Sequence, residues 1–175
     1  MSKLIRYFVE GECEKKFLKS FMYLDCDCFI EGKVEVLNFV NTKISKPFAR
    51  SIKKDTRVVI ITDTDAGDTT ILDYNIETLI NISLIPVENI VVVQSVKNFE
   101  EEIIYSCSQI HDINQLLSTK GKDEFKKKFI AHKDLVSKLH SVGFSINKIW
   151  SRKANPPFDK YNNDSQKIKK DGTLR

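Results

Sequence analysis

The chain has 175 residues, enough for one domain with a complete core and a small appendage. Its 41% hydrophobic and 30% charged residues are typical of a globular protein and exclude a disordered chain, and its apolar runs are too short to cross a bilayer. No apolar leader with a small-residue cleavage site follows Met1, so we expect a cytoplasmic protein with no membrane contact.

The net charge of +4 is unevenly distributed along the chain. Residues 1–119 carry 13 Lys and Arg against 18 Asp and Glu, whereas residues 120–175 carry 15 against 6. Clustered Lys and Arg grip phosphate backbones, so the basic last third could hold a polyanion. A solvated face or a mobile tail would give the same composition.

The first hundred residues alternate strand and helix patterns. Continuous apolar runs are typical of strands buried on both faces of a parallel sheet, and apolar stripes at helical spacing lie between these runs. The predicted strands are 4–9, 33–39, 57–62 and 90–93, and the predicted helices between them are 12–23, 45–54 and 69–84. This order predicts an α/β fold with a mostly parallel sheet of about four strands flanked by helices.

From Ser95 onward the pattern changes to helix-like segments. Amphipathic stretches at 125–130 and 134–139 predict helices, and from Ser151 onward apolar residues become rare. Pro156-Pro157 and scattered lysines there favour an extended or mobile tail, with Phe158 and Tyr161 as its large apolar anchors. We therefore expect a catalytic α/β domain over 1–107, a helical extension over 108–150 and a basic tail over 151–175.

The four cysteines, Cys13, Cys26, Cys28 and Cys107, contain no CxxC pair, and the three histidines supply no second ligand pair at zinc spacing. We expect reduced structural thiols and no zinc site.

Acidic residues follow two of the predicted strands. Glu10 comes directly after the first strand, and Asp63 and Asp65 come directly after the third. Ligands bind outside the carboxyl ends of parallel strands, and several carboxylates in one crevice repel one another unless a cation or a proton intervenes. Hard carboxylate oxygens suit Mg²⁺ or Mn²⁺, so the sequence predicts a divalent-metal site at this edge.

The acidic pattern resembles the TOPRIM domain of topoisomerases, bacterial primases, ribonuclease M5 and OLD-type nucleases. The resemblance rests on Glu10-Gly11 after one strand and on Asp63 and Asp65 after a later one, and it covers roughly residues 4–104. The run Val9-Glu10-Gly11-Glu12-Cys13-Glu14 is similar to the opening motif of OLD-like nucleases. The run Lys97-Asn98-Phe99-Glu100-Glu101 is similar to the motif that carries a further acidic residue in the OLD and ribonuclease M5 branch.

The resemblance implies a metal-dependent nuclease that cuts DNA or RNA. Its implied catalytic residues are Glu10, Asp63, Asp65 and Lys97, where the lysine would stabilise charge on the reacting phosphate or protonate the leaving oxygen. The implied ligands of one or two ions are Glu10, Glu14, Asp63, Asp65, Asp68 and Glu100. The basic residues expected to contact nucleic acid are Lys126, Lys127, Lys128, Arg152 and Lys153.

The resemblance also bears on partners. OLD nucleases carry an ATPase domain, and this chain has no GxxxxGK[ST] loop. An ATPase would therefore be a separate subunit, as in a two-component anti-phage defence system.

Other readings of the same residues stay open. Asp63, Asp65 and Asp68 could be turn and N-cap residues before a helix, and Glu12 and Glu14 could favour the positive end of theirs. A phospho-receiver signalling domain would use Asp63 as phosphate acceptor with Lys97 as its partner, although it would want an acidic pair directly after the first strand. An inactive TOPRIM module could serve as an assembly or sensor subunit.

Overall fold

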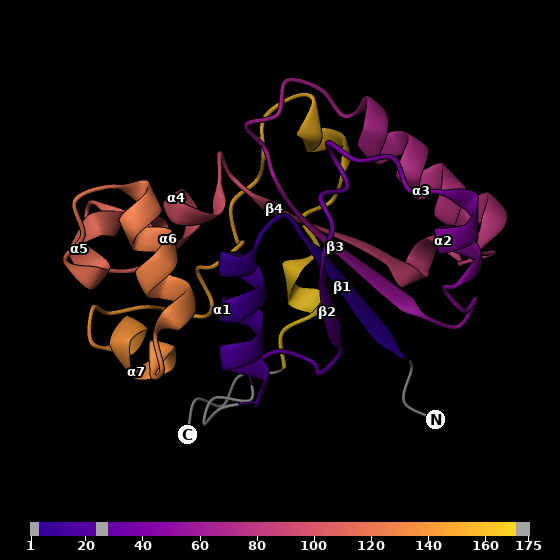
Figure 1. Cartoon of the computed structure of the whole chain (residues 1–175). Helices are drawn as coiled ribbons and strands as arrows, with labels where there is room; N and C mark the ends of the chain where they lie inside the picture. The colour runs from indigo at the N-terminus through magenta and orange to yellow at the C-terminus, as the bar shows by residue number, and fades with distance from the viewer. Residues whose placement is uncertain (1–3, 24–27, 171–175) are drawn as a thin grey trace.

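The computed structural model describes residues 4–23 and 28–170 and shows an α/β fold around a four-stranded sheet. The strands are β1 (Ile5–Val9), β2 (Lys33–Val36), β3 (Arg57–Asp63) and β4 (Ile90–Ser95). All pairings are parallel and the strand order is β2-β1-β3-β4, so the prediction of a parallel sheet of about four strands is confirmed (Figure 1). All carboxyl ends of the strands therefore meet at one edge.

The helices cover both faces of the sheet. On one face lies α1 (Glu12–Tyr23); on the other lie α2 (Lys46–Arg50) and α3 (Thr70–Ile82) (Figure 1). Because both faces are covered, the central strands are buried along almost their whole length, as their continuous apolar runs predict. Each face has its own hydrophobic cluster. Successive side chains along a strand point to opposite faces, so the central strands contribute to both clusters.

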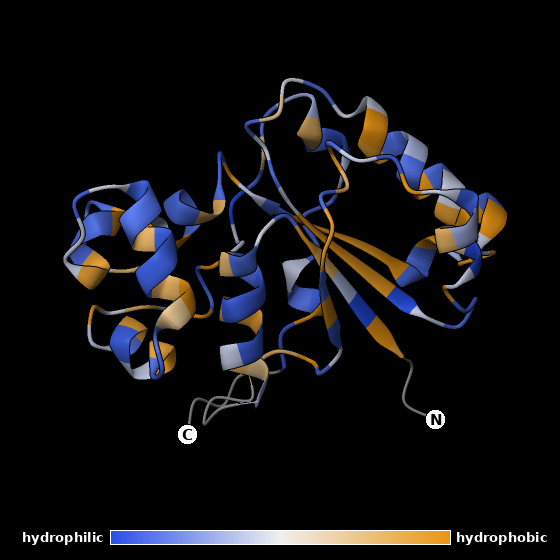
Figure 2. Ribbon diagram, in the orientation of Figure 1, coloured by the Kyte–Doolittle hydropathy of each residue, from blue (hydrophilic) through white to orange (hydrophobic). Residues whose placement is uncertain are grey.

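Four more helices follow the last strand: α4 (Phe99–Ser106), α5 (Ile113–Leu117), α6 (Lys122–Ala131) and α7 (Leu135–His140). Helices α6 and α7 pack against α1, which puts the later helices on the α1 side of the sheet (Figure 1). Their polar faces point outward and their apolar residues join the cluster under α1 (Figure 2). The short helix α5 was not predicted, although its Asp112 capping box is a recognisable start signal.

The last described residues, 150–170, form a strap across the sheet rather than the extended or mobile tail that their composition favoured. Trp150 and Ile168 are buried in the cluster under α1, and Phe158 is buried in the cluster on the opposite face. The strap contains two short 3₁₀ turns, η2 (Phe158–Lys160) and η3 (Ser165–Lys167). A few large apolar side chains are enough to hold the strap in place. Residues 171–175 lie outside the described part of the chain.

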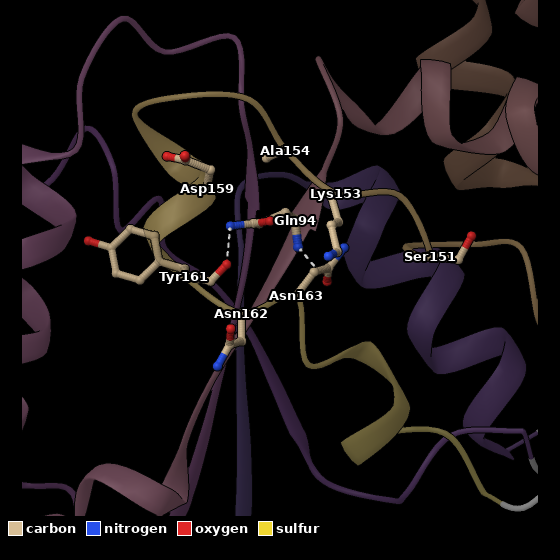
Figure 3. A pocket seen from close by; sticks show the side chains of 8 residues that line it. All are labelled: Gln94, Ser151, Lys153, Ala154, Asp159, Tyr161, Asn162 and Asn163. Atoms are coloured by element: carbon tan, nitrogen blue, oxygen red, sulfur yellow. Dashed lines mark hydrogen bonds between the residues drawn. The ribbon is translucent and has the colours of Figure 1, made fainter.

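Hydrogen bonds tie the strap to the free edge of β4. The side-chain amide of Gln94 donates to the backbone carbonyl oxygens of Phe158 (2.7 Å) and Tyr161 (3.3 Å), and the backbone N–H of Gln94 donates to Asn163 Oδ1 (3.3 Å), as Figure 3 shows in part. The backbone N–H of Asp164 donates to the carbonyl of Val92 at 3.2 Å. The strap thus covers an edge strand that would otherwise expose unpaired backbone groups.

Two predicted elements are shorter in the structure. The strand expected over 33–39 ends at Val36, and the helix expected over 45–54 covers only Lys46–Arg50. Asn38 accounts for the first difference, because its side-chain oxygen accepts the backbone N–H groups of Val40 and Asn41 and closes a turn. Phe39 is then free to enter the α2–α3 cluster.

The cysteines differ in part from expectation. Cys13 and Cys107 are free and buried, as predicted, whereas Cys28 is disulfide-bonded. Cys26 lies outside the described residues. Within the described ranges, no helix is long and apolar enough to cross a membrane.

The strap generates a stability prediction. Phe158→Ala removes a side chain with no exposed surface from the α2–α3 cluster, so we expect a loss of about 3–5 kcal/mol in the free energy of unfolding, measured by urea denaturation. The control is Lys153→Ala at an exposed strap position, which should change stability by less than about 0.5 kcal/mol. Equal stabilities of the two variants would mean that the strap is not part of the fold.

Candidate metal and phosphodiester site

The site lies where β1 and β3 run side by side in the centre of the sheet. Strand β2 lies on one side of β1 and strand β3 lies on the other, so the strand order reverses between β1 and β3. Ligands of open α/β sheets bind at such a switch point, outside the carboxyl ends of the strands. Glu10 directly follows β1, and Asp63 is the last residue of β3.

Glu10 is held by three hydrogen bonds. Its Oε1 accepts the hydroxyl of Thr62 at 2.7 Å and the backbone N–H of Asp63 at 2.9 Å, and its Oε2 accepts the side-chain amide of Asn38 at 2.8 Å. Burial raises the pKa of Glu10, and the three donors oppose that rise because they favour the ionised form. The carboxylate is therefore fixed in orientation before any ligand arrives.

Three further carboxyl groups that are buried or partly buried share this edge with Glu10. Glu14 in the first turn of α1 and Glu100 in the first turn of α4 are both buried, and Asp63 is partly buried. Burial, followed by repulsion from Glu10 and Glu14, raises the pKa of Asp63 to about 9. Burial is also the main reason that the pKa of Glu14 rises to about 7. Carboxyl groups are thus crowded here, and burial and mutual repulsion favour the protonated forms of Asp63 and Glu14.

These groups line a cavity of about 360 Å³ at the carboxyl edge of the sheet. Its lining residues are Glu10, Gly11, Glu12, Cys13, Glu14, Asp63, Glu100, Lys126 and Ile130. Lys126 on α6 is the one cation among these described residues, and its Nζ lies 3.5 Å from an oxygen of Glu100. Gly11 leaves room for Glu14, because a Cβ at position 11 would come within 3.0 Å of the Glu14 carboxylate. We refer to this space as the acidic cavity.

Asp65 and Asp68 lie on the exposed loop between β3 and α3. The backbone N–H of Asp65 donates to the carbonyl of Lys97 at 3.0 Å, which fixes the start of this loop against the turn after β4. Asp65 is close enough to raise the pKa of Asp63. Asp68 accepts the backbone N–H of Thr70, as a turn residue before a helix does, so its structural role is the simpler reading.

Lys97 is exposed and is absent from the described lining of the acidic cavity. Its backbone has φ of 67°, in the left-handed region, and its carbonyl accepts the N–H groups of Thr64 and Asp65. In this structure the residue shapes the loop through its backbone, and Lys126 is the lysine whose side chain reaches the carboxylates.

The other four basic residues predicted to contact nucleic acid do not line the acidic cavity. The guanidinium of Arg152 is already engaged by the buried Glu102 at 2.8 Å, by the carbonyl of Val96 and by the ring of Tyr105. Arg152 therefore has a structural role in this turn, and its contact with nucleic acid stays a prediction. Lys153 lines a separate cavity of about 310 Å³ beside the strap (Figure 3). Lys127 and Lys128 are exposed on α6.

Sequence reasoning missed the polar residues that support the site. Thr62 and Asn38 hold Glu10, and Glu102 accepts the backbone N–H groups of Val96 and Trp150, which fixes the turn after β4. Thr62 and Asn38 do lie near strand ends in the sequence. Glu102 has no local signal, because its partners are up to 50 residues away.

The carboxyl groups of this edge fit a divalent metal ion in their chemistry but do not converge on one point. Within residues 4–23 and 28–170, no three His, Cys, Asp or Glu side chains converge closely enough to hold an ion as they stand. The groups at this edge are nevertheless carboxylate oxygens in excess over cations, which is the chemistry that Mg²⁺ and Mn²⁺ require.

The chain was compared with models of known protein families, with curated proteins and with solved structures, and none of the three comparisons finds a match.

The elevated pKa of Asp63 generates a stability prediction. Its pKa is 3.8 in an unfolded chain and about 9 in the folded protein, so its favourable contribution is complete below about pH 4 and is lost as the pH rises through about 9. The Asp63→Asn variant has no ionisable group at this position, so it does not lose this stability as the pH rises. In urea denaturation with a chelator at about pH 8, we expect the variant to be about 1–3 kcal/mol more stable than the wild type, with a smaller difference at about pH 5.

The control for this series is Asp159→Asn at an exposed strap position, which should follow the wild type at both pH values. If Asp63→Asn is less stable than the wild type at about pH 8, the result contradicts the crowding of carboxyl groups around Asp63.

Proposed function

We propose that the chain is a metal-dependent nuclease that hydrolyses phosphodiester bonds of DNA or RNA with a TOPRIM-like site. The observation that carries the proposal is that Glu10 and Asp63 lie at the carboxyl ends of adjacent parallel strands and are joined by the hydrogen bond from Asp63 N to Glu10 Oε1. Glu14 and Glu100 add two buried carboxyl groups beside them. Buried carboxyl groups in this number are costly unless they serve a ligand.

A divalent ion bound here would polarise the phosphodiester and lower the pKa of an attacking water. Glu10 would be its fixed ligand, because Thr62 and Asn38 already hold the carboxylate. Asp63 and Glu14 would be the ligands that adjust. Asp65 lies on the exposed side, where it would complete the set toward the substrate.

Lys126 is better placed than Lys97 to contact the scissile phosphate. Its ammonium reaches into the acidic cavity and pairs with Glu100, and the side chain is about half exposed. A lysine in that position can bind a phosphate oxygen as a point charge and stabilise the charge that develops on it. A separate ATPase subunit remains part of the proposal on the strength of the resemblance to OLD nucleases.

The proposal predicts a defined pattern of activity. Plasmid, single-stranded DNA and total RNA are incubated with the protein and Mg²⁺ or Mn²⁺, and products are resolved on gels. We expect Glu10→Gln and Asp63→Asn each to reduce cleavage at least about a hundredfold, because each removes a ligand charge. The matched control Glu77→Gln, on the exposed face of α3, should cleave like the wild type.

Cleavage that survives both site substitutions would rule out this site as the catalytic centre. If the wild type is silent, calorimetric titration with Mn²⁺ decides the matter: binding lost in Glu10→Gln supports a nuclease that awaits its partner, and no binding supports an inactive module.

A phospho-receiver domain remains the second candidate, because the strand order 2-1-3-4 is also the beginning of the doubly wound order used by such domains. Incubation with acetyl phosphate separates the two functions. A nuclease takes up no phosphate, whereas a receiver would be labelled on Asp63 and would lose the label in Asp63→Asn.

A further inference from the structure

Helix α6 separates two cavities of opposite chemistry. Lys126 and Ile130, one turn apart, line the acidic cavity. Lys128, Ala131 and His132 line a second, more open groove on the other flank of the helix. A single helix of ten residues therefore borders both the proposed catalytic cavity and another concave surface.

The position of α6 is fixed by its inner face. Phe125 and Phe129 have no exposed surface and pack in the cluster under α1, with their ring centroids 5.2 Å apart. Because successive residues turn by about 100° around a helix, Lys127 points outward between the two flanks. Lys127 is exposed, so the outer ridge of α6 carries a positive charge from one flank to the other.

The second groove is basic. It lies between α5, α6 and α7, and its volume is about 480 Å³. Its lining residues are Leu117, Ser118, Lys128, Ala131, His132 and Lys138, with no carboxylate among these described residues. We call it the basic groove.

Two polar groups that line the basic groove are weakly paired or unpaired among the described residues. His132 Nδ1 is buried and has no hydrogen-bond partner in the described part of the protein, although a ring nitrogen ordinarily has one. Lys128 is paired with Glu124 at 2.9 Å on the exposed side, and its remaining contact is a long one of 3.4 Å to the carbonyl of Ser118. An exposed lysine pair of this kind is weak and can be exchanged for a phosphate.

We propose that the basic groove binds phosphate groups of the nucleic-acid strand whose scissile phosphate occupies the acidic cavity, with Lys127 on the ridge between them. The inference rests on the proposed nuclease function and adds the path of the substrate across the protein. The width of a helix with its side chains, about 10–12 Å, separates the two sites, so phosphates a few nucleotides apart on one strand can reach both. The path also gives a role to the run Lys126-Lys127-Lys128 on α6, which lies between the two cavities.

The test measures binding without cleavage. Short fluorescein-labelled single-stranded DNA, duplex DNA and RNA of one sequence are titrated with protein in a buffer with EDTA, and anisotropy gives the Kd at several salt concentrations. For Lys128→Ala/Lys138→Ala we expect binding about tenfold weaker and a salt slope reduced by about 1.4 to 1.8, the change for two lost phosphate contacts.

The matched control is Lys53→Ala/Lys54→Ala, which removes the same charge from exposed positions just before β3, at the opposite edge of the sheet from both cavities. It should bind within about twofold of the wild type, since only distant charge is lost. Thermal melting of all variants checks that they are folded.

Equal weakening in the two double variants, or no binding by the wild type, would overturn the basic groove as a substrate site. Asp63→Asn makes this failure distinct from failure of the nuclease proposal, because it should retain binding to the groove and lose cleavage. If the wild type binds nucleic acid through the basic groove but neither cleaves it nor binds Mn²⁺, the nuclease proposal fails and the groove proposal stands. The three oligonucleotides show whether the groove prefers a single strand, a duplex or RNA.

Discussion

The parallel pairing of β1 with β3 is the constraint on which the site depends. Phe8 lies opposite Ile60 in this register, so the residues that follow place Glu10 beside Thr62 and Asp63. A slip of one residue would turn every side chain of a strand to the other face and break both hydrophobic clusters. The same burial that fixes the register therefore fixes the carboxylates.

Such a site is costly to the folded state. Asp63, Glu14 and Glu10 all have raised pKa values because burial disfavours their charged forms. The rest of the fold offsets this cost through two clusters that share the sheet, and the strap contributes to both. Stability lost at a ligand site and supplied elsewhere is a common arrangement in enzymes.

Much of this fold could be read from the sequence because local patterns dominate it. The strands have continuous apolar runs, and α1 begins and ends where its amphipathic stripe does. The strap could not be read in this way, because its anchors Phe158 and Ile168 are isolated in a polar segment and gain meaning only from the cavities they fill. The same holds for the candidate site. The positions of Glu10 and Asp63 could be predicted because each lies at the end of a recognisable strand. The contact of Lys126 with the carboxylates could not, because it depends on the packing of α6 on α1.

The position of a bound ion shows most directly whether Glu10 and Asp63 form a metal site. Crystals grown or soaked with Mn²⁺ would be measured for anomalous scattering. We expect a peak within coordination distance of carboxylate oxygens of both Glu10 and Asp63. A well-ordered crystal at saturating Mn²⁺ with no peak between these residues, or with its peaks elsewhere, would contradict this expectation.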